Sequence, residues 1–240
     1  MQKICRQSGL SANTLKLIAV AAMILQHCAI LFLSHETATY ILFCSLGKIT
    51  APVMSYFIAE GFHYTHDRKG YLKRLFIFAL ISHIPHALAF GFPIWMFWKY
   101  TSVMWSHTMG LTALMIFYHR QWSKPLRILG ILACCALSYP GNWNCVVVIW
   151  ILGFGIFRDQ PVKKWVMFLL GILVNVLEFF IIETDGALIT NVAFILPVLL
   201  LTQYNGQRGK TSLWIKRFFY WSYPIHLLVI YGIHLLTVSV

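Results

Sequence analysis

Residues 15–33 read LKLIAVAAMILQHCAILFL, an apolar run interrupted only by Lys16 and by the pair Gln26-His27. A bilayer hydrocarbon core about 30 Å thick needs roughly 20 consecutive, mainly apolar residues in a helix. Because lipid offers no hydrogen-bond partners, a spanning segment of this kind satisfies its backbone internally as an α-helix. The run therefore predicts a transmembrane helix.

Similar apolar runs, separated by short polar breaks, recur along the rest of the chain. Together with the first they are Leu15–Leu33, Ile41–His63, Tyr71–Phe90, Val103–Tyr118, Leu126–Tyr139, Cys145–Phe157, Trp165–Ile182, Leu188–Tyr204 and Phe218–Thr237. The fourth, fifth and sixth runs are short and need flanking residues to cross a bilayer. No alternation of polar and apolar residues recurs, which argues against a barrel. We predict an all-α, polytopic integral membrane helical bundle of about nine transmembrane helices, with residues 1–240 forming a single membrane-embedded domain.

The composition supports a membrane location. Hydrophobic residues make up 59% of the chain, charged residues make up 11%, and the mean hydropathy is +0.72. Soluble globular domains carry about 25% charged residues, so this chain has too little polar surface for a water-soluble particle. The six cysteines are scattered and none forms a CxxC pair. We therefore expect neither a disulfide framework nor a bound metal.

The basic residues predict an orientation. The chain has 19 Lys and Arg against 7 Asp and Glu, which gives a formal net charge of +12. With nine spans, every Lys and Arg except Lys48 and Lys99 falls in a loop or at a span end on one side of the membrane. Cytoplasmic loops carry such an excess, so we predict a multi-pass membrane protein with a cytoplasmic N-terminus. The basic charge then marks topology, and no nucleic-acid partner is expected.

A set of ionisable side chains lies within the predicted spans or at their edges. They are His27, Lys48, Glu60, His63, His83, His86, His107, Glu178, His226 and His234. Ionisable groups at hydrocarbon depth are costly and usually face the bundle interior, where they mark functional sites. His234 lies near the outer end of the last run, and we interpret it as an interfacial residue.

Lys16 and His27 share the first predicted span. Eleven steps of helical rise put them roughly 16 Å apart on one face of the helix, with His27 near the membrane midplane. A basic group near the cytoplasmic mouth could hold a phosphate-rich donor, and a midplane imidazole could act as a general base on an amine or hydroxyl. On spacing alone an alternative stays open, in which Lys16 only marks topology and His27 is a helix–helix hydrogen-bond partner.

Two further pairs of polar residues have both structural and functional interpretations. Glu60 and His63 share a helix face, but a metal site in a bundle needs a second Glu-x-x-His motif, and none is found. A structural polar pair is the alternative. His83 and His86 flank a predicted kink at Pro85, which suggests a cavity wall, with a metal site as the alternative.

The remaining polar residues lie singly in the later runs. His107 opens the fourth run at its outer edge. Glu178 lies in the outer half of the seventh run, where Lys48 or a histidine is its expected partner, because an unpaired charge is costly at that depth. His226 follows Pro224 in the last run. A proline and an ionisable side chain inside one span are both costly, which suggests that His226 has a role in a site. A polar packing contact is the alternative.

Several stretches of the chain, taken in order, resemble one family. They are Thr14–Ala19 followed by His27, Glu60–Phe62, the basic segment 67–75, residues 78–85, the loop YNGQRGK at 204–210, and Tyr223-Pro224-Ile225-His226. From Leu10 to about Gly232 the chain resembles the TraX family, whose founding member is the F-pilin acetylase. TraX proteins are in turn similar to the membrane acyltransferase-3 superfamily, which carries a basic residue, ten residues and a histidine in its first helix. Here those positions are Lys16 and His27.

The resemblance implies a membrane-bound, acyltransferase-like domain in the bacterial inner (cell) membrane. It would move an acetyl or acyl group from cytoplasmic acetyl-CoA to an acceptor at the membrane, with the N-terminal amine of a conjugative pilin as the first choice. The implied site has His27 as catalytic base with His226 and Glu60 as further catalytic candidates, Lys16, Arg74 and Arg208 against the CoA phosphates, and His83, His86, His107 and Glu178 as candidates for substrate binding. No metal is expected.

Two positions depart from the family's pattern. Many relatives have Asp directly before the first-helix histidine, where this chain has Gln26, and His83 replaces an acidic residue. A glutamine cannot carry the charge that stabilises an imidazolium, which puts activity and acceptor choice in question. The acceptor class (pilin, peptide, lipid or sugar), the acyl chain length and the oligomeric state stay open. So do two other functions: a small transporter or proton-coupled channel using the intramembrane histidines, and a non-enzymatic pilin chaperone.

Overall fold

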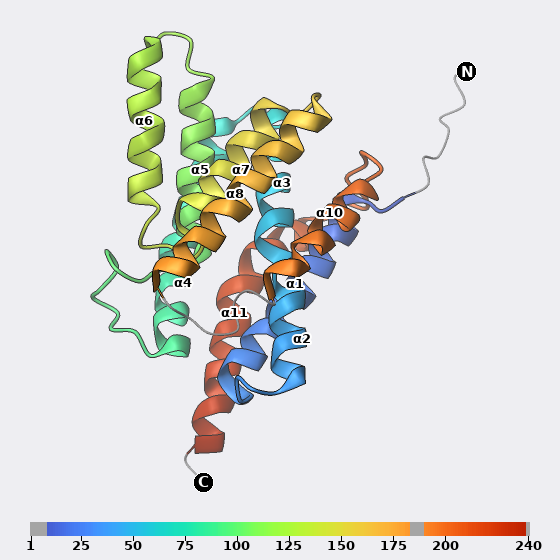
Figure 1. Cartoon of the computed structure of the whole chain (residues 1–240), viewed down its shortest axis with the longest axis vertical. Helices are drawn as coiled ribbons and strands as arrows, with labels where there is room; N and C mark the ends of the chain where they lie inside the picture. Colours follow the sequence, from blue (N-terminus) through green and yellow to red (C-terminus); the bar gives the residue numbers. More distant parts are fainter. Residues whose placement is uncertain (1–8, 183–189, 239–240) are drawn as a thin grey trace.

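The computed structural model describes residues 9–182 and 190–238, and the regular structure over these ranges is helical, with two isolated β-bridges and no strand. In chain order the elements are α1 (Ala12–Phe32), α2 (Ala38–Gly47), α3 (Thr50–Tyr64), α4 (Arg68–Phe90), α5 (Val103–Phe117), α6 (Lys124–Leu137), α7 (Asn144–Ile156), α8 (Pro161–Ile182), η1 (Val192–Phe194), α10 (Ile195–Thr202) and α11 (Leu213–Val238). The all-α class is thus confirmed for the described residues (Figure 1).

Short polar side chains set where several helices begin. The side chain of Ser11 accepts a hydrogen bond from the backbone N–H of Thr14 at the start of α1. Asp67 Oδ1 accepts from Gly70 N at 2.8 Å at the start of α4. Such caps satisfy N–H groups that have no partner within the first helical turn. The polar residues that precede an apolar run in the sequence thus cap the beginnings of α1 and α4.

The second predicted run, Ile41–His63, is two helices rather than one. The chain leaves α2 at Gly47 and re-enters a helix at Thr50. Pro52 explains the break, because it has no N–H and its ring clashes with the carbonyl four residues earlier in a continuous helix. In the first turn of α3 neither cost arises. The hydroxyl of Thr50 then donates to the backbone carbonyl of Ala19 at 2.9 Å, which ties α3 to α1.

Helix length supports a membrane bundle but not the full number of crossings. Four segments of the described chain are long and apolar enough to span a bilayer: Ala12–Phe32, Ala38–Tyr64, Arg68–Phe90 and Leu213–Thr237. The fourth to sixth runs form α5, α6 and α7, of 15, 14 and 13 residues. The eighth run, Leu188–Tyr204, begins outside the described residues. The described chain is therefore a helical bundle with several candidate spans, and nine crossings are not shown.

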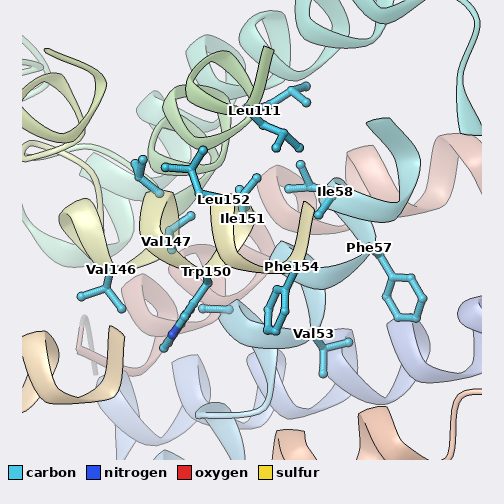
Figure 2. Close-up of a cluster of buried hydrophobic side chains, with 14 of the residues drawn as sticks. Val53, Phe57, Ile58, Leu111, Val146, Val147, Trp150, Ile151, Leu152 and Phe154 are labelled. Atoms are coloured by element: carbon cyan, nitrogen blue, oxygen red, sulfur yellow. The ribbon is translucent and has the colours of Figure 1, made fainter. Parts of the chain in front are cut away.

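The main hydrophobic core lies where α7 passes between α3, α5 and α8. Figure 2 shows this cluster, which contains Val53, Phe57 and Ile58 of α3, Leu111 of α5, and Val146, Val147, Trp150, Ile151, Leu152 and Phe154 of α7. The buried indole of Trp150 donates to the carbonyl of Phe168 at 3.0 Å. A Cβ at Gly110 of α5 would lie 2.5 Å from Ile151 Cδ1, so glycine permits this close helix contact.

A second, smaller cluster joins the first helix to the last. It contains Val20 and Met23 of α1, Ala89 of α4, and Tyr223 and Leu227 of α11. Residues from opposite ends of the chain thus lie side by side, and Figure 1 shows α11 running beside α1 and α4. The cavity described next is bounded by these three helices together with α3 and α5.

Candidate functional site

One cavity of about 1610 Å³ runs between the helices, lined mainly by residues of α1, α3, α4, α5 and α11, with single residues of α2 and α7 and residues of four connecting segments. It is larger than the usual small-molecule pocket of roughly 300–1,000 Å³. Cationic side chains gather at one end, which we call the basic end. The other, which we call the aromatic end, is lined by Phe90, Phe92 and Tyr100, with Lys99 over the ring of Tyr100. The histidine on α1 lies between the two.

Five cations line the basic end: Lys16, Arg74, Arg208, Lys216 and Arg217. Three of them, Lys16, Arg74 and Arg208, were predicted from the sequence as phosphate contacts, and the structure brings all three to this cavity. The ammonium of Lys16 lies 5.1 Å from the ring centre of Phe57 and 5.4 Å from that of Phe219. These aromatic faces hold the cation within the cavity.

The loop after α10 fixes Arg208 at the basic end. The N–H groups of Ala12 and Asn13 donate to the carbonyls of Gln207 and Arg208, at 2.9 and 3.2 Å. The side-chain amide of Asn13 also donates to the carbonyl of Lys210 at 2.6 Å. The loop therefore supplies the acceptors that the first turn of α1 lacks, and it holds Arg208 beside Lys16.

His27 of α1 and His226 of α11 form the centre of the site. Nδ1 of His27 lies 2.7 Å from Nε2 of His226, and both residues are buried. The ring of Phe90 meets His27 edge-on at 5.5 Å, and that of Tyr223 does so at 6.2 Å. His27 lines the cavity, whereas His226 is absent from its lining and sits behind His27. The structure thus brings together two histidines that the sequence singled out separately.

Gln26, the residue before His27, also lines the cavity. Its side chain packs against Gly47 of α2, where an added Cβ would collide with it. The hydrogen-bond partner of His27 is instead the imidazole of His226. The polar partner of His27 is therefore a second imidazole and not a carboxylate.

The aromatic end contains two of the predicted substrate-binding histidines. His86 lines it, 4.9 Å from the ring of Phe90, and the rings of Phe92 and Tyr100 stack at 4.3 Å. His107 also lines the cavity, with Nε2 3.4 Å from the hydroxyl oxygen of Ser55.

The other two predicted substrate-binding residues do not line the cavity, but each contacts a residue that does, Thr101 or Asn144. His83 Nε2 donates to the carbonyl of Ile94 at 2.7 Å, and its Nδ1 lies 3.2 Å from the hydroxyl of Thr101. The carboxylate of Glu178 lies 3.4 Å from the side-chain amide of Asn144, in place of the contact with Lys48 or a histidine that the sequence suggested. Neither residue is itself part of the cavity lining.

Glu60 lines the basic end but lies apart from the histidine pair. Its Oε1 accepts a hydrogen bond of 2.8 Å from Arg158 Nε, and Arg158 also donates to the hydroxyl of Tyr64. Partial burial acts to lower the pKa of Arg158, but the charge of Glu60 and the Tyr64 hydroxyl outweigh that effect and raise it. His63 bonds separately to the carbonyl of Gly155 at 2.8 Å, so Glu60 and His63 do not act as a pair.

Some residues of the site were missed from the sequence. Lys216 and Arg217 were counted only as topological charges, although their place shortly after Arg208 was a usable signal. Phe90, which flanks His27, carried no signal beyond an apolar pattern, whereas Tyr223 belongs to a stretch that carries the family resemblance but was given no role in the site. Among the described residues, no three His, Cys, Asp or Glu side chains come together as a metal site requires.

These features define a class: a helical membrane protein whose long internal cavity joins a cluster of cations to a buried histidine pair. The chain belongs to the TraX protein family, whose model matches residues 11–234, as its sequence predicted. Over 233 residues it is 29% identical to a protein of Dichelobacter nodosus described as "Probable fimbrial assembly protein FimC, serogroup H1". That similarity covers 92% of this chain and 95% of the relative. No solved structure matches the chain.

Proposed function

We propose that this protein is a membrane acetyltransferase. It takes the acetyl group of acetyl-CoA at the basic end of the cavity and transfers it to an acceptor amine that approaches from the aromatic end. The observation that carries the proposal is the cavity itself, because it joins five cations to His27 in one space. A cluster of this kind suits a polyphosphate, and a buried imidazole suits proton abstraction from an amine.

The donor is assigned to the basic end by charge. Lys16, Arg74 and Arg208 are the contacts proposed for the CoA phosphates, with Lys216 and Arg217 beside them. Lys16 and His27 are separated by about 16 Å of helical rise, a span suited to the long, flexible thioester arm of CoA. With the basic end facing the cytoplasm, where the positive-inside rule puts it, the donor is the cytoplasmic pool of acyl-CoA.

The chemistry needs one base and a positioned thioester. The acceptor nitrogen attacks the thioester carbonyl carbon, a C–N bond forms, and His27 takes the proton that the nitrogen loses. The C–S bond then breaks, and the departing CoA sulfur recovers that proton from His27. Holding both reactants in one buried cavity lowers the barrier through proximity, in addition to base catalysis.

The acceptor that we propose is the N-terminal amine of a pilin at the inner membrane. Membership of the TraX family and the similarity to a probable fimbrial assembly protein both support a pilus subunit as the partner. The word "assembly" in that description also fits a chaperone that binds pilin without chemistry. If the protein is a chaperone, pilin should still bind when His27 is replaced. If the protein is the proposed enzyme, replacement of His27 should abolish acetyl transfer.

The test uses isolated bacterial membranes and acetyl-CoA labelled in the acetyl carbon. Membranes with wild-type protein, His27→Ala, His66→Ala or no protein are compared at equal expression. His66→Ala is the matched control, because His66 is exposed and absent from the cavity lining. We expect label in a protein or lipid band with wild type and His66→Ala only. Full labelling by His27→Ala would refute His27 as the base, and no label in pilin-containing membranes would refute the acetyltransferase.

A further inference from the structure

We infer that His226 is a positioning residue that fixes the tautomer of His27, so that the nitrogen His27 offers to the cavity, Nε2, is the unprotonated one. The inference rests on the proposed function, in which His27 is the base. The inference goes beyond that function because it assigns a proton to a stated atom of each imidazole ring. The contacts of the two histidines carry the argument.

The two imidazoles lie side by side in one plane. Their ring planes differ by 6°, their centres are 5.0 Å apart, and the nearest nitrogens are 2.7 Å apart. Rings stacked face to face at this centre separation would hold their nitrogens farther from each other. The short N···N distance therefore requires an edge-to-edge arrangement, in which an N–H of one ring points along the in-plane lone pair of the other.

The backbone of α11 decides which nitrogen donates. Nδ1 of His226 lies 2.7 Å from the carbonyl oxygen of Ser222, one helical turn earlier. A carbonyl oxygen only accepts, so Nδ1 of His226 carries the hydrogen, and in the neutral ring Nε2 is left as an acceptor. That Nε2 faces Nδ1 of His27, which must therefore donate. A neutral imidazole has one N–H, so Nε2 of His27 keeps its lone pair.

This arrangement prepares His27 for proton abstraction without a neighbouring carboxylate. Nδ1 of His27 is occupied by His226, and among the described residues no hydrogen bond is found at Nε2. When Nε2 takes a proton, the positive charge is stabilised through Nδ1–H by the lone pair of His226, which the Ser222 carbonyl supports in turn. Because His226 is absent from the cavity lining, it acts through His27 rather than on a substrate.

A direct test is the ¹⁵N spectrum of the wild-type protein in membranes, with all histidines labelled. His27 is assigned as the signal that disappears in His27→Gln. We expect Nδ1 of His27 to have the shift of a protonated nitrogen and Nε2 that of an unprotonated one. The opposite pattern, with hydrogen on Nε2, would overturn the inference. This measurement needs neither acceptor nor turnover, so it stands even if acetyl transfer is never observed.

A kinetic test compares His226→Leu with His226→Gln. Leucine removes the acceptor, whereas the glutamine side chain keeps an oxygen that can accept from His27 Nδ1. We expect acetyl transfer to fall about 100-fold or more in His226→Leu, the usual size of a general-base contribution, and to be partly restored in His226→Gln. His234→Leu, on the same helix but beyond the cavity, is the control and retains the wild-type rate.

The outcomes separate the inference from the function on which it rests. A wild-type rate in His226→Leu, or equal losses in both variants, would overturn the positioning role. The predicted ¹⁵N tautomer in a protein that transfers no acetyl group would leave the assignment of the protons intact and refute the acetyltransferase instead.

Discussion

Arg158 and Glu60, 98 residues apart in the chain, are joined by a hydrogen bond of 2.8 Å between Arg158 Nε and Glu60 Oε1. Arg158 follows α7, and Glu60 lies in the last turns of α3. The contact therefore fastens the α7–α8 turn to the rim of the basic end. It also pairs the one carboxylate that lines the cavity within the described chain with a cation from outside the lining. Glu60 is thereby kept from pairing with the cations of the basic end, of which Arg74 has the exposed Asp67 3.8 Å away.

Removal of Arg158 should destabilise the protein. Glu60 is only 7% exposed, and in Arg158→Met its carboxylate loses its charged partner. A buried group deprived of its hydrogen bond costs about 1–3 kcal/mol. We expect a lower midpoint of thermal unfolding in detergent for Arg158→Met, partly recovered by adding Glu60→Gln. Arg120→Met, at an exposed site, is the control. An unchanged midpoint in Arg158→Met would contradict a stabilising role.

Loss of single cations at the basic end should weaken CoA binding. Lys16→Met and Arg208→Met each remove one proposed phosphate contact, and a hydrogen bond to a charged group contributes about 1.5–3 kcal/mol. We expect the Kd for CoA to rise roughly 10- to 100-fold in each, as measured by calorimetry on protein in nanodiscs. Lys124→Met, which removes an exposed cation outside the cavity, should bind as wild type does. Equal affinity in all three variants would show that the phosphates bind elsewhere.

The close contact of α5 and α7 should tolerate no side chain at Gly110. The Cβ of any residue there would lie 2.5 Å from Cδ1 and 3.2 Å from Cβ of Ile151. The Cδ1 atom can rotate away, but the Cβ of Ile151 moves only if its helix shifts. Overpacking of this kind costs about 1–3 kcal/mol. Gly110→Leu should therefore lower the unfolding midpoint. Gly232→Leu should leave it unchanged, because nothing lies within 4 Å of an added Cβ there. Similar midpoints for both variants would argue against this packing.

The orientation in the membrane can be tested by labelling. In a variant whose native cysteines are replaced by serine, Lys99→Cys should react with an impermeant maleimide in intact spheroplasts. Lys124→Cys should react only after the membrane is opened. The reason is that positively charged loops stay in the cytoplasm, and Lys99 lies in a loop predicted on the other side. The reverse pattern of labelling would invert the topology and move the basic end away from cytoplasmic CoA.

Local rules predicted much of the helical content. The run at Leu15–Leu33 is α1 with little change in its bounds, and helical spacing was enough to relate Lys16 to His27. The break between α2 and α3 was missed, because Pro52 sits inside an otherwise unbroken apolar run. Apolar composition cannot tell one helix from two, and only the backbone cost of the proline reveals the break.

Contacts between helices that are distant in the chain could not be predicted from the sequence. His27 and His226 were each noticed as polar residues at hydrocarbon depth, but their pairing depends on how α1 and α11 pack. The same holds for Glu178, whose neighbour is Asn144 rather than Lys48 or a histidine. Spacing within one helix is set by local geometry, whereas the choice of partner is set by tertiary packing, which no single run encodes.

The contacts that complete the site connect the beginning of the chain to its last part. His27 meets His226 across 199 positions, and Asn13 meets Lys210 across 197. During synthesis α1 enters the bilayer long before the ribosome has made the loop after α10 or α11. Until then His27 lacks the imidazole of His226, and the basic end lacks three of its five cations. On the proposed function, a nascent or truncated chain without α11 should therefore transfer no acetyl group, and the insertion of α11 would be the event that completes the site.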